Sequence, residues 1–316
     1  MNYRRLGHSG LRVSEIGLGS WLTLGSSVDA GGTRALVQRA FELGINLFDT
    51  ADVYSDGACE EALGKALREL PRGELVIATK AYFPTGPGAN QRGLSRKHLV
   101  ASVEASLRRL GCDHIDLHQC HRFDPETPLE ETVATYADLV RAGKLRYWGV
   151  SLWTPRQILR AAWTARRLRA PRPVSNQPEY SLLQRDPERR LLRASRWLGV
   201  SQLAWSPLAQ GVLTGKYAQA AAPAGSRGAD AARSPFMARY LGESLRARVA
   251  QLEPLARERG LTTAQLALAW CLREPNVASL LVGATRVPQL EENAAASGVV
   301  LDPGLLERLD ALFARA

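Results

Sequence analysis

Hydrophobic residues along the chain form short runs that alternate with longer amphipathic segments. The short runs are rich in Val, Ile, Leu and aromatic residues, as buried strands are, and the longer segments carry apolar residues at helical spacing. Strands are predicted at residues 14–20, 45–50, 74–80, 114–121, 145–151, 173–180, 201–207 and 277–284. Strands and helices that alternate over nearly the whole length are typical of parallel βα units. We therefore expect an α/β protein.

Local start and stop signals support the helices between these strands. Three helices are expected to begin with a capping box, formed by Thr127 with Glu130, Thr154 with Gln157, and Thr262 with Gln265. In two of them a proline follows the threonine, as is favoured in a first helical turn. Three glycines fall just past the last apolar position of a helix, where a left-handed residue is favoured: Gly44, Gly111 and Gly143.

Loop lengths indicate how the units are arranged. The links from helix to strand are short, whereas the strand-to-helix links at about 20–32, 81–96 and 208–243 are long. In a (β/α)8 TIM barrel the strand-to-helix loops build the active site on the C-terminal face. We predict such a barrel as a single domain over residues 1–316, with long loops at that face. The turn at residues 8–10 predicts an N-terminal β-hairpin that plugs the opposite end.

An open doubly wound sheet also alternates strands with helices. Such a sheet normally carries a glycine-rich phosphate turn after its first strand. The glycines at Gly17 and Gly19 have no third glycine at the required spacing. A dinucleotide, if bound, must therefore be held in another way.

Composition narrows the class of protein. The formal charge of +10 comes with many arginines on predicted outer helix faces and with no nucleic-acid motif, which favours a solvated surface over a nucleic-acid partner. No apolar run approaches the ~20 residues of a membrane span, and the N-terminus lacks the pattern of a signal peptide. We expect a cytoplasmic protein with no membrane insertion. The cysteines, Cys59, Cys112, Cys120 and Cys271, lack paired spacing and favour reduced thiols.

Polar residues follow several predicted strands at the same end of the barrel. Asp49, Lys80 and His121 close their strands, and Tyr54 lies just after Asp49. A buried lysine paired with an aspartate keeps its charge and is expected to lower the pKa of a nearby tyrosine below about 10, which makes the phenol a usable acid. Each residue alone is more often a cap or a surface charge. Four of them at one end favour an active site.

A metal site is the competing interpretation of one segment, because Cys112, His114, His118, Cys120 and His121 lie within ten residues. Strand alternation divides this set, since His121 shares a face with Gln119 while His118 shares the other with Cys120. No paired zinc spacing is present. We expect no metal site.

Longer motifs carry a specific resemblance. They are GLGSW, FDTADVYSDGACEEALGKAL, RGLSRKH, DPETPLEETV, YWGVS, AWSPLAQGVLTGKY, LALAWCL and LVGATRVPQLEEN, in register from Tyr3 to Leu301. With these motifs the sequence resembles the aldo-keto reductase superfamily, and within it the branch of potassium-channel β-subunits and their bacterial relatives. The resemblance implies an NADPH-dependent oxidoreductase that reduces small aldehydes or ketones.

The resemblance also implies a catalytic tetrad, made of the same four strand-end residues. Tyr54 is then the general acid, Lys80 paired with Asp49 lowers the Tyr54 pKa, and His121 orients the substrate carbonyl for hydride transfer from the nicotinamide. The expected substrate pocket is formed by Trp21, Tyr54, Tyr82, Phe83 and His121.

In relatives NADP(H) lies extended across the barrel mouth, and the matching residues are expected to bind it here. Around the nicotinamide these are Gly19, Ser20, Trp21, Asp49, Ser151, Gln177 and Trp205. The pyrophosphate run matches Ser206, Pro207, Leu208, Gln210, Gly211, Leu213, Thr214 and Lys216, with Arg227 on a lid. The adenosine end matches Gly283, Thr285, Arg286, Gln289, Glu292 and Asn293, of which Thr285, Arg286 and Gln289 are the expected partners of the 2′-phosphate.

The sequence departs from the channel subunits at two site positions. Leu152 stands where they carry a basic residue, and His121 stands where they tend to have asparagine. The histidine favours an enzyme with ordinary catalytic turnover. The alternative is a slow-turnover NADP(H)-binding redox sensor, a partner of a channel or another membrane protein. The resemblance also allows a homo-oligomer, because relatives in this branch form tetramers or larger rings.

Overall fold

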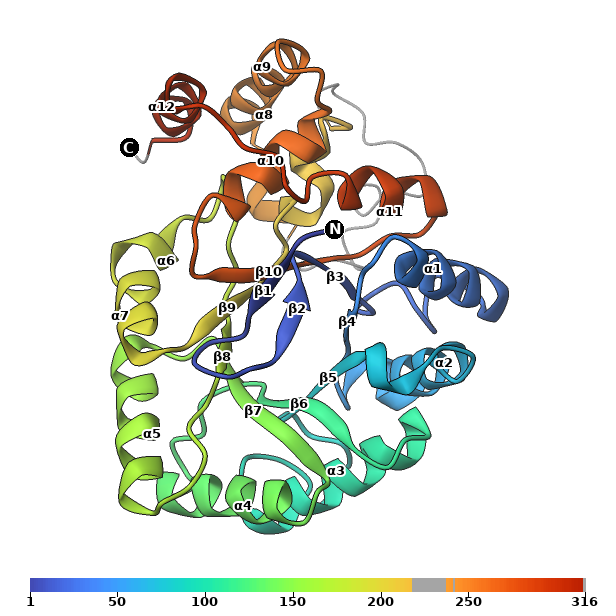
Figure 1. Ribbon diagram of the computed structural model, residues 1–316, viewed down its shortest axis with the longest axis vertical. Coiled ribbons are helices and arrows are strands. Elements are labelled where there is room, and N and C mark those ends of the chain that lie inside the picture. The colour runs from blue at the N-terminus through green and yellow to red at the C-terminus, as the bar shows by residue number, and fades with distance from the viewer. Residues whose placement is uncertain (218–236, 241, 315–316) are drawn as a thin grey trace.

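The computed structural model of the protein describes residues 1–217, 237–240 and 242–314. Within these residues eight parallel strands close into a barrel with the order β10-β3-β4-β5-β6-β7-β8-β9, and helices surround it (Figure 1). This is the predicted (β/α)8 TIM barrel. Because parallel strands all end at one rim, the residues that close different strands face the same opening.

The element boundaries follow the predicted alternation. The barrel strands are β3 (Ile16–Gly19), β4 (Leu47–Asp49), β5 (Val76–Ala81), β6 (Ile115–Cys120), β7 (Leu145–Ser151), β8 (Ser175–Gln177), β9 (Ser201–Trp205) and β10 (Val277–Val282). The helices of the first half are α1 (Ala30–Glu42), α2 (Ala58–Leu67), α3 (Arg96–Leu110), α4 (Leu129–Arg141) and α5 (Pro155–Arg167). The later helices are α6 (Asp186–Arg189), α7 (Leu191–Leu198), α8 (Glu243–Ala250), α9 (Leu252–Arg257), α10 (Thr263–Leu272), α11 (Val287–Ala294) and α12 (Pro303–Leu312).

The N-terminal hairpin closes the barrel end opposite the site. Strands β1 (Tyr3–Arg5) and β2 (Arg12–Ser14) pair antiparallel and cross the barrel opening that faces the viewer in Figure 1. Leu6 and Val13 are fully buried there and pack on strand residues inside the barrel, among them Leu117. Gly7, with φ of +59°, lies against the main chain of Val174, where a Cβ atom would meet a carbonyl oxygen at 2.3 Å. The hairpin plug is thus confirmed.

The helix caps agree with the sequence except at one position. Thr154 and Thr262 form their capping boxes, with Gln157 and Gln265 respectively. The capping box expected at Thr127 is wrong, because its hydroxyl donates to the Asp124 carboxylate at 2.6 Å and α4 begins after Pro128 without a side-chain cap. The expected strand at 173–180 shortens to β8, since the prolines beside it cannot donate hydrogen bonds to a sheet.

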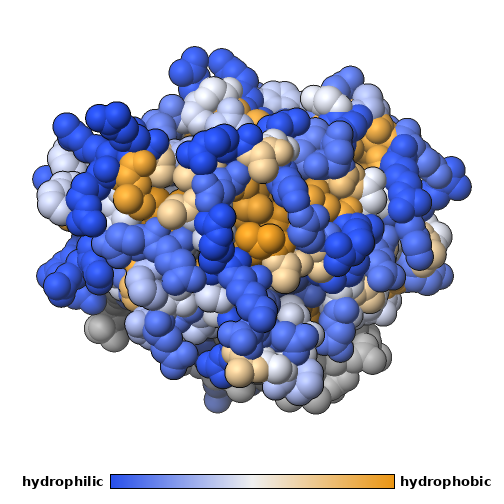
Figure 2. Space-filling model, turned by 90° about the horizontal axis from the view of Figure 1, so that it is seen from below, coloured by the Kyte–Doolittle hydropathy of each residue, from blue (hydrophilic) through white to orange (hydrophobic). Residues whose placement is uncertain are grey.

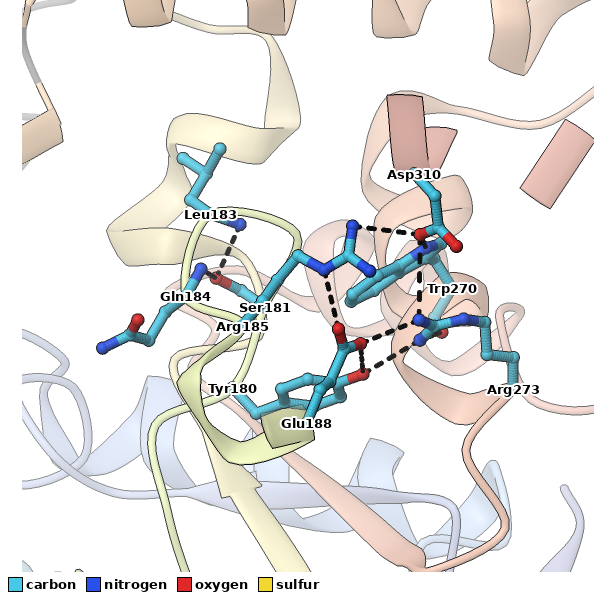
Figure 3. A network of polar contacts seen from close by, with 9 residues as sticks. All are labelled: Tyr180, Ser181, Leu183, Gln184, Arg185, Glu188, Trp270, Arg273 and Asp310. Carbon is cyan, nitrogen blue, oxygen red and sulfur yellow. Dashed lines mark hydrogen bonds and ion pairs between the residues drawn. The ribbon is translucent and has the colours of Figure 1, made fainter. Parts of the chain in front are cut away.

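A network of polar contacts fastens the C-terminal helix to the barrel (Figure 3). Glu188 accepts hydrogen bonds from Arg185 and Arg273 at 2.8 Å each and from the Tyr180 hydroxyl at 2.7 Å. Asp310 of α12 pairs with Arg185 at 3.0 Å and accepts from the Trp270 indole at 3.1 Å. The two guanidinium groups stack on the Trp270 ring. Because both arginines are paired with carboxylates and the Trp270 indole N–H has an acceptor, this network holds α10 and α12 together.

The outer surface is mostly hydrophilic. The face at the bottom of Figure 1, seen in Figure 2, shows hydrophilic residues around a central group of hydrophobic residues. Arginines of the expected helix faces are exposed, for example Arg166, Arg193 and Arg196. No helix of the described residues is both long enough and apolar enough to cross a membrane.

Candidate active site

Four side chains from neighbouring βα units meet at the C-terminal rim of the barrel. Asp49 closes β4, Lys80 lies next to the end of β5, and His121 directly follows β6. Tyr54 begins the short 3-10 helix η1 (Tyr54–Gly57), in the connection between β4 and α2. The structure thus brings together the four residues that the sequence places at strand ends.

Lys80 is the centre of this group. Its side chain has no solvent-exposed surface, and its Nζ atom lies 2.5 Å from Asp49 Oδ1, 2.7 Å from the Thr50 carbonyl oxygen and 3.4 Å from the Tyr54 hydroxyl. The ammonium has three N–H donors, and the carboxylate, the carbonyl oxygen and the phenol oxygen supply one acceptor for each. The lysine therefore links Asp49 to Tyr54.

Tyr54 is presented by a strained turn. Ser55, Asp56 and Gly57 follow it with φ values of 47°, 52° and 92°, and the left-handed region costs about 1–3 kcal/mol for a residue with a side chain. The Arg109 side chain lies against Gly57 of this turn and donates to Glu60 at 2.6 Å, and Glu60 is fully buried and also accepts from Thr79 at 2.6 Å. These contacts connect the turn that follows Tyr54 to α3 and β5.

The fourth residue, His121, stands among aromatic side chains. Its ring lies edge-on to Tyr54, with centroids 5.7 Å apart, and edge-on to Phe83 at 4.9 Å. Phe83 packs in turn on Tyr82 at 5.3 Å. The Nδ1 atom of His121 is buried and has no hydrogen-bond partner among the described residues. Because Nδ1 is closed off from solvent, a small molecule that reaches this ring would meet its other nitrogen, Nε2.

A cavity of about 340 Å³ opens at this position. It is lined by Gly19, Trp21, Leu22, Asp49, Val53, Tyr54, Ser55, Phe83, His121, Arg122, Ser151, Gln177, Trp205, Ser206, Gln210, Leu281 and Gly283. A concave, largely apolar site with a few converging polar groups is typical of a small-molecule site. Trp21, Tyr54, Phe83 and His121 of the expected substrate pocket line it, whereas Tyr82 lies behind Phe83.

Electrostatics define the protonation states. Burial lowers the pKa of Lys80, but Asp49 and Tyr54 outweigh it and hold that pKa above the usual 10.5, so the ammonium persists at neutral pH. Burial and the charges of Lys80 and Arg122 hold the pKa of His121 well below 6.5. The imidazole is therefore neutral.

The expectation that Lys80 lowers the pKa of Tyr54 below its usual value is wrong. Burial raises the pKa of the phenol, Lys80 lowers it and Asp49 raises it, and the resulting pKa lies above the usual 10.0 rather than below it. The sequence shows the charges but not the depth of burial, and burial is the larger effect. Tyr54 thus holds its proton at neutral pH.

Strand alternation divides the histidines as the sequence indicates. His118 points outward and forms a 2.9 Å hydrogen bond with Tyr136 of α4, whereas Gln119 accepts from Ser175 of β8 at 3.3 Å. The described residues contain no group of three His, Cys, Asp or Glu side chains arranged to hold a metal ion.

Most residues expected near a nicotinamide line the cavity. These are Gly19, Trp21, Asp49, Ser151, Gln177 and Trp205. Ser206 and Gln210, expected at the pyrophosphate, and Gly283, expected at the adenosine end, also line it. Ser151 donates to the Gln177 main chain at 3.0 Å, and Gln177 donates to Asp49 at 2.9 Å. Ser20 differs, because its side chain is fully buried, does not line the cavity and has no hydrogen-bond partner for its hydroxyl among the described residues.

The residues expected at the pyrophosphate lie in the connection after β9. The 3-10 helix η3 (Ala209–Thr214) contains Ala209, Gln210 and Gly211 in succession with φ of 46°, 60° and 91°. The N–H groups of these residues are used within the segment, because Ala209 donates to the Ser206 carbonyl oxygen at 2.9 Å, Gln210 to the Ser206 hydroxyl at 3.3 Å and Gly211 to the Leu208 carbonyl oxygen at 2.9 Å. Pro207, Leu208, Leu213, Thr214 and Lys216 lie in the same segment and do not line the cavity. Arg227 lies outside the described residues.

The residues expected at the adenosine end surround the start of α11. Arg286 is exposed and directly precedes this helix, and Gln289 accepts a hydrogen bond of 2.9 Å from the Thr285 main chain. Glu292 is half-buried and Asn293 is buried on the same helix. Of the residues expected at the adenosine end, Gly283 lines the cavity, whereas Thr285, Arg286, Gln289, Glu292 and Asn293 do not.

Five residues line the cavity without a sequence prediction: Leu22, Val53, Ser55, Arg122 and Leu281. Arg122 is adjacent to His121, and a search of the positions next to each strand-end residue would have found it. Leu22 has φ of 59°, so its direction cannot be inferred from strand alternation.

Comparison with known proteins identifies relatives over the whole chain. Residues 15–314 match the model of the Aldo/keto reductase family. A protein from Arabidopsis thaliana named "Probable voltage-gated potassium channel subunit beta" is 42% identical over 315 residues, 98% of this chain and 96% of that protein. A protein of the same name from Oryza sativa subsp. japonica is 42% identical over 317 residues, 99% of this chain and 96% of that protein.

Proposed function

Because this chain belongs to the aldo/keto reductase family, we propose that it is an NADPH-dependent reductase of small aldehydes or ketones. The observation that carries this proposal is that Asp49, Tyr54 and His121 line one cavity, while Lys80 is buried beside it and contacts both Asp49 and Tyr54. Acid–base reduction of a carbonyl needs a proton donor next to the carbonyl oxygen and a second group that orients it.

The residues present fit a dinucleotide cofactor. Trp205 and Gln177 line the cavity where a nicotinamide ring would lie, and Ser206 and Gln210 bring polar side chains to the same wall. The positive backbone end of α11, with Arg286 beside it, suits the 2′-phosphate. When bound, NADPH supplies the hydride.

Tyr54 is the general acid in this proposal. Its phenol is protonated at neutral pH, and it stands at the cavity wall, where a carbonyl oxygen can accept the proton. Lys80 lies 3.4 Å from the hydroxyl and favours the phenolate left behind, so its charge offsets part of the cost of burial. Asp49 keeps the ammonium in position.

His121 acts as the orienting residue. Since its imidazole is neutral, it can donate one N–H to the carbonyl oxygen without competing with Tyr54 as an acid. The aromatic wall of Trp21 and Phe83 excludes water from the reacting carbon.

A slow-turnover NADP(H) sensor is the second candidate. The observation that favours it is the identity of 42% with proteins named as channel β-subunits. Such a protein would hold the cofactor tightly and require a membrane partner. The presence of His121 together with Tyr54 and the Lys80–Asp49 pair favours the reductase.

The experiment measures the loss of absorbance of the reduced nicotinamide when purified protein meets methylglyoxal or an activated aromatic aldehyde. NADPH and NADH are run in parallel. Multiple turnovers with NADPH support the reductase. Tight binding of NADPH with almost no consumption, whatever the aldehyde, would instead support the sensor.

A further inference from the structure

Arg122 is a cavity residue whose charge the reaction described above does not use. It follows His121 and is half-buried on the cavity wall, beside Tyr54 and Phe83. Its guanidinium carbon lies 5.1 Å from the centre of the Phe83 ring, and that ring lies 4.9 Å from His121. The cation is thus held one aromatic ring away from the group proposed to orient the carbonyl.

This guanidinium lacks the partner that comparable arginines have. In the part of the chain that the structure describes, Arg109, Arg185 and Arg273 are also half-buried, and each pairs with a glutamate. No carboxylate among the described residues pairs with Arg122, whose hydrogen bond goes to the His121 carbonyl oxygen at 2.6 Å. Because a guanidinium has five N–H donors, most of its hydrogen-bonding capacity remains for a ligand.

The balance of charges in the cavity lining also indicates a site for an anionic group. Asp49 and Arg122 are the charged side chains in its lining, and Asp49 is already paired with Lys80. The site therefore carries an excess of one positive charge, which belongs to Arg122. Burial lowers the pKa of this guanidinium, as expected for a cation that lacks a counter-charge.

We propose that Arg122 binds an anionic group of the substrate, so that the protein prefers aldehydes that carry a carboxylate or a phosphate over neutral aldehydes. A planar guanidinium matches both oxyanions in a two-point contact, and its stacking on Phe83 fixes the plane of that contact. This inference rests on the proposed reductase function. It names the substrate class of that same site.

The test compares two matched aromatic aldehydes, 4-carboxybenzaldehyde and its neutral methyl ester, by kcat/KM with NADPH. Arg122→Gln should lower kcat/KM for the carboxylate by about 10- to 100-fold while the value for the ester stays within about threefold. Arg122→Lys should retain part of the preference, because it keeps the charge but loses the fork. Arg92→Gln, an exposed arginine outside the cavity lining, is the control and should change neither value.

A second pair, glyceraldehyde 3-phosphate and glyceraldehyde, separates the two oxyanions. If the loss in Arg122→Gln is confined to one pair, that oxyanion is the ligand. An equal loss for charged and neutral aldehydes would overturn the proposal, since it would mean that Arg122 only supports the His121 main chain. A weaker affinity for NADPH in Arg122→Gln would also overturn it, because the arginine would then serve the cofactor.

A measurement on the unaltered protein keeps the test independent of folding defects. Benzoate should compete with the aldehyde at a concentration at least about tenfold lower than benzamide does. Equal inhibition by the two would contradict the proposal. If the wild type reduces no aldehyde of either kind, the proposed function itself fails, whereas turnover of neutral aldehydes without any anion preference removes this inference alone.

Discussion

Gln177 reaches Asp49 from the opposite side of the barrel. Its Nε2 donates to Asp49 Oδ2 at 2.9 Å, while Asp49 Oδ1 accepts from Lys80. Strands β4 and β8 lie four positions apart in the closed order of eight strands, so this bond spans the barrel mouth. The carboxylate that holds the lysine is thus itself held on both oxygens.

Gln177→Leu should therefore destabilise the protein. It removes a donor from a buried carboxylate oxygen, which costs about 1–3 kcal/mol of the free energy of unfolding. Urea unfolding at neutral pH measures this cost, and Gln251→Leu, at an exposed position, should cost much less. Equal stability of Gln177→Leu and the wild type would show that the bond contributes nothing.

His121→Asn tests the orienting role. The amide keeps an N–H donor but changes its reach, so kcat with a neutral aldehyde should fall by about 10- to 100-fold, and His121→Phe, which has no donor, should fall further. Because the pKa of His121 lies well below 6.5, kcat/KM of the wild type should show no imidazole titration between pH 6 and 8. A change in kcat/KM near pH 6.5 that is seen in the wild type and disappears in His121→Asn would contradict the neutral imidazole.

Asp52 makes stability depend on pH. Burial, with a contribution from Glu60, raises the pKa of this carboxyl from 3.8 to about 7. The folded protein therefore holds a proton that the unfolded chain releases, and the wild type loses stability as pH rises from about 4 to 7. Asp52→Asn stays neutral, so above pH 7 it should be more stable by about 2–4 kcal/mol, and the difference should vanish near pH 4.

Asp56→Asn is the matched control for this titration. Asp56 is exposed in the same turn, with φ of 52°, a conformation that asparagine also adopts readily. Thermal or urea unfolding from pH 4 to 8 should show little change for it at any pH. A gain for Asp52→Asn that is the same at every pH would argue that packing, rather than ionisation, is responsible.

Arg286→Ala tests the proposed choice of cofactor. If Arg286 binds the 2′-phosphate, this change should weaken NADPH binding by about 10- to 100-fold and leave NADH binding within about threefold. Arg166→Ala, on the outer face of α5, should alter neither affinity. Titration of protein fluorescence with each cofactor measures both. A parallel loss for NADPH and NADH would assign Arg286 to a part that the two cofactors share.

The strand-end residues could be predicted because parallel strands end at one rim. Asp49, Lys80 and His121 follow from that rule alone, and the structure agrees with it, because Asp49 and His121 line one cavity and Lys80 is paired with Asp49. Tyr54 could be added because it lies in the loop just after Asp49, and the family motifs imply the same four residues.

Other features depended on contacts that a sequence does not display. The pKa of Tyr54 is set by a balance in which burial exceeds the effect of Lys80. Thr127 does not cap its helix, because Asp124 competes for its hydroxyl. Leu22 lines the cavity through a left-handed backbone conformation, which neither hydrophobicity nor spacing indicates.

The most direct test of Tyr54 as the general acid is single-turnover oxidation of bound NADPH by an activated aromatic aldehyde in wild type and Tyr54→Phe. The phenylalanine keeps the ring against His121 and removes only the hydroxyl. The proposed mechanism predicts that the rate falls by about 10²- to 10⁴-fold while the affinity for NADPH, measured separately, stays within about threefold. A Tyr54→Phe variant that binds NADPH normally and oxidises it at the wild-type rate would contradict the assignment of Tyr54 as the proton donor.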